Sequence, residues 1–186
     1  MLALLVYTYK IMKASESPYK EIQWLQTGFP NLDKILGGGI PSRKITEISG
    51  VFSVGKSTLA LHIISEAQKL DMDTLWCDSE FSFGEDYATS LGVDCNKLDL
   101  IQGRFAEENL DAIEEWADEH KNALMVLDSI GGLLPRAEME KNADGKIIGG
   151  QAKLIATFCR KIVPILAVNH SALIVCNHQF TDLMSG

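Results

Sequence analysis

Two patterns of apolar positions alternate along the chain from residue 44 onward. Short β-rich or unbroken apolar runs are typical of strands in the interior of a parallel sheet, and they occupy residues 44–48, 74–77, 123–127 and 172–176. Between them, apolar residues recur at helical spacing over 59–70, 110–117 and 151–163. The alternation predicts an α/β fold with a mainly parallel sheet flanked by helices. We also expect Pro164 to kink or end the last helix.

The chain divides into an N-terminal arm, residues 1–26, and a core, residues 27–186. The arm begins with an apolar run and continues with scattered charges around Pro18. A turn and a short helix are expected after Thr27, and the glycine-rich stretch Gly37–Pro41 breaks the chain.

Composition narrows the class of protein. The 186 residues are 46% hydrophobic and 23% charged, which excludes disordered, collagen-like and disulfide-scaffold chains. The four cysteines show neither C-x-x-C nor metal-ligand spacing, which favours a reduced, cytoplasmic chain. The apolar runs are too short to span a bilayer, and the start lacks the basic region and cleavage site of a signal peptide. We therefore expect no membrane partner.

The net charge of −8 is unevenly distributed. Residues 78–119 hold 13 acidic residues against Lys97 and Arg104, a local net charge of −11, so the rest of the chain carries +3. An acidic total therefore does not exclude a local face that binds anions such as nucleic acid.

Residues 50–57 match the phosphate-loop pattern G-x-x-x-x-G-K-[ST], between a predicted strand and a helix that opens at Thr58. Glycines allow backbone N–H groups to turn inward around a phosphate, and the following helix adds its positive N-terminus. Lys56 supplies a mobile positive charge, and Ser57 offers a hydroxyl to Mg²⁺. The alternative to a phosphate-binding loop is a turn that contains glycines and a lysine without binding a nucleotide. The residues expected to bind the nucleotide here are Gly50, Ser53, Val54, Gly55, Lys56, Ser57 and Thr58.

Two carboxylates follow predicted strands. Asp128 comes directly after the run 123–127, at the strand end where open α/β sheets bind ligands, and would hold the Mg²⁺ shell with Ser57. Glu80 follows the strand 74–77 and could polarise an attacking water. By spacing alone, an acidic turn without a catalytic role remains the alternative for Glu80.

Several separate blocks in a fixed order give the chain a family resemblance. They are Thr27–Pro41, the phosphate loop, Asp78–Phe81, Tyr87, Leu91–Asp94, Leu127–Ser129, Pro135–Glu138 and Asn177–His178. From about residue 27 to its end, the chain resembles the RecA-type homologous recombinases. It resembles phage recombinases of the UvsX kind more than bacterial RecA.

The resemblance implies roles for particular residues. Glu80 would be the catalytic carboxylate, acting with Lys56, and Tyr87 would stack on the adenine. Gly84 stands where the family has an acid that contacts adenine, so base recognition would be looser or differently built. His178 stands where bacterial RecA has a glutamine that senses the γ-phosphate, and the phage recombinases share the histidine.

The resemblance also places a DNA-binding region. Residues 141–150 correspond to the family's first DNA-binding loop, and the stretch from Asp144 to Lys161 has a net charge of +3. Contacts from such charges to the phosphate backbone would be salt-dependent and largely independent of sequence. A solvated helix face is the alternative. The DNA-binding candidates are Arg136, Lys146, Ile148, Lys153 and Arg160.

The implied activity is a DNA-dependent ATPase of recombination and repair that uses ATP and Mg²⁺ and binds single-stranded DNA in RecA-like filaments. The implied location is the cytoplasm of a bacterial or phage-infected cell. Self-association, as a filament or ring, would use the arm 1–26. The chain stops near the start of the family's second DNA-binding loop, so we expect it to lack the last strands, to leave one sheet edge unprotected and to lack the basic residues that reach a neighbour's ATP.

Two alternatives to a DNA-dependent recombination ATPase remain. One is a truncated nucleotide-binding module that associates with itself or with full-length recombinase without efficient catalysis. The other is a different RecA-fold ATPase of the helicase or clock type, against which the spacing of Tyr87 and the block Pro135–Glu138 argue.

Overall fold

A five-stranded, wholly parallel sheet forms the centre of the computed structural model, which describes residues 12–19, 21–139 and 150–179. The strand order is β3-β7-β6-β4-β5. This confirms the predicted fold class. The strands are β3 (Ile45–Gly50), β4 (Thr74–Asp78), β5 (Leu98–Ile101), β6 (Leu124–Asp128) and β7 (Ala172–His178).

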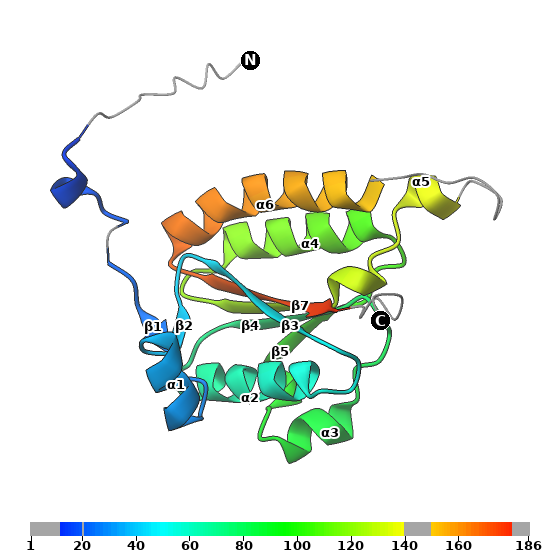
Figure 1. Ribbon diagram of the computed structural model, residues 1–186, viewed down its shortest axis with the longest axis horizontal. Helices are drawn as coiled ribbons and strands as arrows, with labels where there is room; N and C mark the ends of the chain where they lie inside the picture. The colour runs from blue at the N-terminus through cyan, green and yellow to red at the C-terminus, as the bar shows by residue number, and fades with distance from the viewer. Residues whose placement is uncertain (1–11, 20, 140–149, 180–186) are drawn as a thin grey trace, which may run out of the picture.

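Helices cover both faces of the sheet (Figure 1). Helices α4 (Ala106–Glu119) and α6 (Gly150–Asn169) lie side by side on one face, and α2 (Lys56–Lys69) lies on the other. The short helix α3 (Glu85–Ser90) lies near α2. The remaining short helices are α1 (Pro30–Leu36), α5 (Arg136–Met139) and the 3₁₀ turns η1 (Ala14–Glu16), η2 (Cys95–Lys97) and η3 (Ile130–Gly132).

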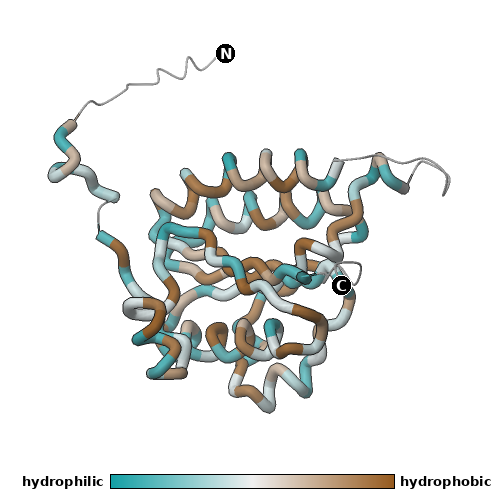
Figure 2. The backbone as a smooth tube through the Cα atoms, in the orientation of Figure 1, coloured by the Kyte–Doolittle hydropathy of each residue, from teal (hydrophilic) through white to brown (hydrophobic). Residues whose placement is uncertain are grey.

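Each helical layer packs on alternate residues of the strands. In β6, Leu124 and Val126 contribute to the hydrophobic core on the α2 side, whereas Met125 and Leu127 contribute to the core under α4 and α6. All four side chains are at most 2% exposed, as expected for a strand buried on both faces. Figure 2 shows the hydrophobic positions along the central strands, between the two helical layers.

A small antiparallel pair lies beside the main sheet. Strand β1 (Trp24–Leu25) pairs with β2 (Ile40–Pro41), and the Leu25 side chain enters the core on the α2 side. Leu25 of the predicted arm is thus packed in the core, while the boundary of the arm as a domain stays a prediction.

Pro164 was expected to kink or end helix α6, and the helix does not end there but continues to Asn169. Proline removes one helical hydrogen bond, to the carbonyl four residues earlier. Pro164 is exposed, on the outer side of the helix, so that carbonyl can turn toward water. Meanwhile Phe158, Ile162 and Leu166 continue the buried stripe of the helix. The free energy gained by packing this helix on the sheet therefore outweighs the free-energy cost of the hydrogen bond that the proline removes.

Strand β3, which leads into the phosphate loop, is an edge strand within the described part of the chain. It pairs with β7 alone among the described residues, and its side chains are half-buried or exposed. This agrees with the expectation of an unprotected sheet edge. Across the described ranges, no helix is both long and apolar enough to span a bilayer.

Candidate nucleotide site

The carboxyl ends of four neighbouring strands bring the predicted site residues to one edge of the sheet. Gly50, the last residue of β3, is in register with His178 at the end of β7. Asp78 at the end of β4 is in register with Asp128 at the end of β6. Parallel strands place ligand sites at this edge. Asp128 ends its strand as predicted, while its role in holding Mg²⁺ stays a prediction.

The phosphate loop takes a backbone path that depends on glycine. Gly55 has a φ of +96°, a left-handed conformation that residues with a Cβ rarely adopt. It directly precedes Lys56, the first residue of α2. Helix α2 has 14 residues, so its N-terminal N–H groups and dipole point into the loop. The loop and the helix end therefore form a site suited to phosphate groups.

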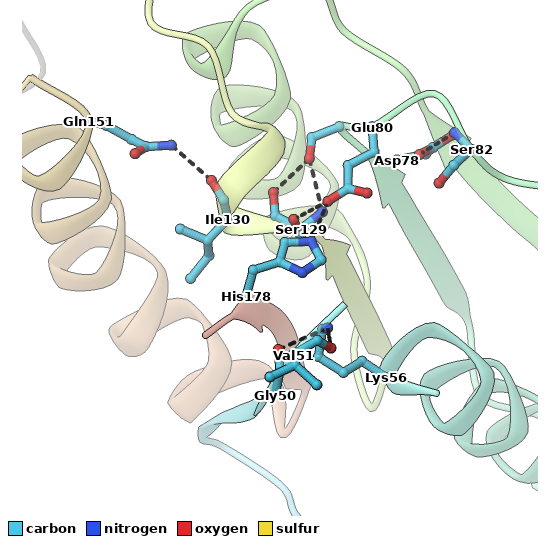
Figure 3. A network of polar contacts seen from close by, with 11 residues as sticks. Gly50, Val51, Lys56, Asp78, Glu80, Ser82, Ser129, Ile130, Gln151 and His178 are labelled. Carbon is cyan, nitrogen blue, oxygen red and sulfur yellow. Dashed lines mark hydrogen bonds and ion pairs between the residues drawn. The ribbon is translucent and has the colours of Figure 1, made fainter. Parts of the chain in front are cut away.

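Lys56 is folded against the loop in this structure. Its Nζ donates to the carbonyl oxygens of Gly50, at 3.1 Å, and Val51, at 2.9 Å, and its side chain is buried (Figure 3). The two carbonyl oxygens accept hydrogen bonds from the ammonium group and hold it beside the loop. From there it can reach an anion bound by the loop N–H groups.

Ser57 and Asp128 form the pair expected to face Mg²⁺. The Ser57 side chain hydrogen-bonds the Asp128 carboxylate, which is 6% exposed. Burial raises the pKa of Asp128, and the nearby charge of Glu80 adds to that shift against the opposing bond from Ser57. A hydroxyl and a carboxylate are the hard oxygen ligands that Mg²⁺ prefers, and Mg²⁺ takes few protein ligands beside substrate phosphates. The residues present therefore fit the ion. Within the described ranges, no cluster of three or more His, Cys, Asp or Glu could hold a metal on its own.

Because burial disfavours the ionised Asp128, we expect Asp128→Asn to become more stable relative to the parent chain as pH rises. Below the ordinary pKa of 3.8 the parent carboxyl is protonated in both the folded and the unfolded chain. Its charge then makes no contribution to the difference in stability between the parent and Asp128→Asn. As pH rises through the interval between 3.8 and the raised folded value, the unfolded chain loses its proton first and the parent loses relative stability. Thermal unfolding with a chelator present, over a series of pH values, measures the effect.

The exposed Asp73, directly before β4, offers a matched control. Asp73→Asn should show no comparable growth of the difference with pH. A difference in Tm between Asp128→Asn and the parent that is constant across the series would contradict the assignment of a charge penalty to Asp128. At neutral pH with Mg²⁺, Asp128→Asn should also bind ATP·Mg²⁺ less tightly.

Glu80 is held by two donors, one directly after β6 and one at the end of β7 (Figure 3). Ser129 Oγ donates a short hydrogen bond to Glu80 Oε1, and His178 Nε2 lies 2.8 Å from the same oxygen. Partial burial raises the pKa of Glu80, but the bonds from Ser129 and His178 outweigh it and hold the pKa below the ordinary 4.5. Glu80 is thus ionised at neutral pH and oriented toward the phosphate loop.

The turn that carries Ser129 is packed closely against Glu80. A Cβ at Gly132 would lie 2.6 Å from Ser79 Oγ and 2.8 Å from Glu80 Cγ, so only glycine fits there. Gln151, in the first turn of α6, donates from Nε2 to the carbonyl oxygens of Ile130 and Leu133, both at 2.9 Å. The turn is therefore fixed both to the carboxylate and to helix α6.

A cavity of about 300 Å³ opens between these groups. Its lining joins most of the phosphate loop with both carboxylates and the histidine: Phe52, Ser53, Gly55, Lys56, Ser57, Thr58, Glu80, Asp128 and His178. Cation, hydroxyl, buried carboxylate and ionised carboxylate face one space, as phosphoryl transfer to water requires.

Tyr87 and Gly84 lie next to this cavity rather than in its lining. The Tyr87 hydroxyl is 2.8 Å from Thr58 Oγ1, so the first turn of α2 is tied to α3. The Tyr87 ring is half exposed and available for stacking. Gly84 is the N-cap of α3, and its adenine-facing place stays a prediction, as does the stacking role of Tyr87.

The DNA-binding candidates are spread over α5 and α6. Lys153 and Arg160 are exposed on α6, and Arg160 Nη2 donates to Thr157 Oγ1. Arg136 forms an ion pair with Glu108 and lies 4.4 Å from the centroid of the Phe105 ring. In this structure the guanidinium charge of Arg136 is therefore paired with a carboxylate of the same chain. The candidates Lys146 and Ile148 lie outside the described residues.

Sequence reasoning did not find three contributors to the site. Ser129 was part of a matching block but had no role, although it follows Asp128 directly. Phe52 stacks on His178, which no periodicity could indicate. Asp78 accepts hydrogen bonds from the backbone N–H groups of Ser82 and Phe83, and so shapes the turn that carries Glu80.

Comparisons with known proteins identify the family of the chain. A family profile described as RecA N-terminal domain matches residues 7–183. Protein RecA of Nitratidesulfovibrio vulgaris (strain Miyazaki F) is 37% identical over 168 residues, which cover 90% of this chain and 47% of that protein. Protein RecA of Ureaplasma parvum serovar 3 is 38% identical over 165 residues, 88% of this chain and 49% of that protein. Protein RecA of Aquifex pyrophilus is 37% identical over 158 residues, 84% and 45% respectively.

The chain spans about half the length of these curated relatives. The match runs through both helical layers, the phosphate loop, Asp128 at the end of β6 and Glu80 in the turn after β4. The five-stranded parallel sheet, its cavity and the profile match together show that the chain belongs to the RecA family, through the ATPase domain of the RecA N-terminal half.

Proposed function

We propose that the chain binds ATP·Mg²⁺, hydrolyses ATP in response to single-stranded DNA, and acts in homologous recombination. One observation carries the proposal: a single cavity brings together Lys56, Ser57, Asp128, Glu80 and His178. The finer expectation, a closer relation to phage recombinases than to bacterial RecA, remains a proposal beside it, since the relatives reported above are bacterial RecA proteins.

The chain's own residues can bind the phosphates, hold Mg²⁺ and accept the proton of the attacking water. The loop N–H groups and Lys56 Nζ would bind the phosphates, while Ser57 and Asp128 would hold Mg²⁺, which would supply neutralisation of developing charge. Glu80 Oε1 is occupied by its two donors, so Oε2 is the oxygen that accepts the proton of the attacking water. His178 keeps the carboxylate aimed at the cavity from the end of the neighbouring strand.

A cationic stretch of α6 supports the DNA part of the proposal. Lys153 and Arg160 are seven residues apart, about two helical turns, so they share one exposed face. Gln151 ties the same helix to the turn that carries Ser129, and Ser129 donates to Glu80. A ligand on this face would therefore bind to α6, the helix that is hydrogen-bonded to the turn beside Glu80.

The double variant Lys153→Ala/Arg160→Ala tests this proposal. We expect weaker binding of a single-stranded oligonucleotide and a salt slope, d log K/d log[salt], that is less steep by about 1.4, since each lost phosphate contact changes it by about 0.7. ATP turnover without DNA should change little, because neither residue lines the cavity. Fluorescence anisotropy at several salt concentrations and phosphate release with and without the oligonucleotide measure these quantities.

Lys121→Ala is the matched control, since this exposed lysine follows α4 and precedes β6, away from the nucleotide edge. An unchanged salt slope in the double variant would remove α6 from the DNA interface. Absence of DNA-stimulated turnover in the parent chain, with ATP still bound, would instead favour the alternative of a nucleotide-binding module without efficient catalysis. Light scattering on the parent and on a chain lacking residues 1–17, which keeps strand β1 and the buried Leu25, tests the proposed self-association through the arm.

A further inference from the structure

We propose that Phe52 is a positioning residue, which holds the His178 ring so that Nε2 donates its proton to Glu80. The inference rests on the proposed function, because the orientation of Glu80 affects turnover only if this cavity binds and hydrolyses ATP. Phe52 would act through His178 and would not itself touch the reacting atoms.

The two rings lie face to face. Their centroids are 4.1 Å apart and their planes are inclined by 17°. Phe52 belongs to the phosphate loop and His178 ends β7, so the stack joins the loop to the strand end that carries the donor to Glu80. On another side, the turn at Gly131 approaches closely, since a Cβ there would lie 3.2 Å from His178 Cδ2. The imidazole is thus confined by the loop and by the turn.

The two ring nitrogens of His178 lie in different surroundings. Nε2 is 2.8 Å from Glu80 Oε1 (Figure 3), whereas Nδ1 is buried and has no hydrogen-bond partner among the described residues. A proton on Nδ1 would be a buried donor without an acceptor, which is costly. The hydrogen-bond network therefore assigns the proton to Nε2, from which it is donated to the carboxylate.

The Phe52 ring contributes to this assignment by covering a face of the imidazole. Without it, water can reach the ring, hydrate Nδ1 and allow the other tautomer or a turned ring to compete. The strength of an aromatic pair corresponds to a change of about 2- to 10-fold in the ratio of the two arrangements. Phe52 is itself 61% exposed, so its truncation removes little buried surface and should leave the fold intact.

Nitrogen NMR of the ¹⁵N-histidine-labelled full chain, recorded at alkaline pH, tests the proposal. The variant His178→Gln assigns the His178 signals among those of the four histidines. In the parent chain we expect the pattern of a single Nε2–H tautomer. In Phe52→Ala we expect signals averaged toward a mixture of tautomers, and in Phe52→Tyr a return to the parent pattern.

Val54→Ala is the matched control, because Val54 lies in the same loop, is equally exposed at 61% and has no ring to stack. It should leave the His178 signals as in the parent. Identical His178 patterns in Phe52→Ala and the parent would overturn the proposal, and so would an Nδ1–H tautomer in the parent.

A kinetic measurement separates this inference from the proposed function. In Phe52→Ala, kcat for ATP should fall about 2- to 10-fold, while the Kd of a fluorescent ATP analogue stays within about twofold, since the phosphates are bound by loop N–H groups and Lys56. A rise in Kd with unchanged kcat would place Phe52 in nucleotide binding and overturn the positioning role. If the parent chain shows no turnover, the proposed function fails, and the NMR comparison still decides whether Phe52 orients His178.

Discussion

Glu80→Gln is expected to reduce ATP turnover by about 10²- to 10⁴-fold, the usual contribution of a positioned general base. The amide has nearly the same shape as the carboxylate, and its oxygen can still accept from Ser129 Oγ and His178 Nε2. It cannot accept the proton of the attacking water. The Kd of ATP·Mg²⁺ should therefore change little while kcat collapses, and phosphate release together with binding of a fluorescent ATP analogue measures both.

The lowered pKa of Glu80 gives this prediction a pH dependence. The hydrogen bonds from Ser129 and His178 favour the ionised carboxylate, so the stability they contribute is present above the ordinary pKa of 4.5 and is lost as pH falls through the lower folded value. Turnover of the parent chain should accordingly show no acidic limb from Glu80 near neutral pH. Glu85→Gln, at an exposed carboxylate of α3, is the control and should turn over like the parent. Turnover in Glu80→Gln equal to that of the parent would remove Glu80 from catalysis.

The parts of the site that local sequence determines were predictable. A phosphate loop requires a strand, a glycine-dependent turn and a helix in immediate succession, so Lys56 and Ser57 could be placed from residues 44–70 alone. Asp128 was predictable for a similar reason, since a wholly apolar run that ends in a carboxylate is typical of a buried parallel strand reaching its ligand edge.

The partners of Glu80 could not be predicted from local sequence. Ser129 is 49 residues away and His178 is 98 residues away, and both bonds depend on the strand order β7-β6-β4. Alternation of strands and helices indicates a parallel sheet but does not fix which strands are neighbours. The resemblance pointed to His178, and the structure shows the carboxylate it contacts.

Short elements escaped the periodicity argument. Strand β5 (Leu98–Ile101) has four residues, with Asp99 and Leu100 both exposed, so it shows neither an apolar run nor clear alternation. Helix α3 (Glu85–Ser90) has six residues and buries only Ala88. Elements of this length owe their structure to tertiary packing and capping rather than to an amphipathic pattern.

Lys56→Ala is expected to weaken ATP binding about 10- to 150-fold, the range that corresponds to losing a hydrogen bond made by a charged group. The Lys56 ammonium is already buried in the loop and bonded to the carbonyl oxygens of Gly50 and Val51. It therefore needs only a small movement to reach an anion that the loop N–H groups hold. Isothermal titration with ATP·Mg²⁺ measures the loss in affinity directly.

Thermal unfolding gives an independent measurement of the same loss, because a ligand that binds only the folded chain stabilises it by about 2.7 kcal/mol at 100 times its Kd. For a domain of this size that corresponds to a rise in Tm of about 5–11 °C, of which Lys56→Ala should lose between about half and about nine-tenths at the same ligand concentration. Lys69→Ala is the matched control, at the opposite end of α2, where the exposed lysine pairs with Glu66. If Lys56→Ala keeps the full nucleotide-dependent rise in Tm, the phosphate loop is not where this chain binds ATP, and the functional assignment of the whole strand edge fails with it.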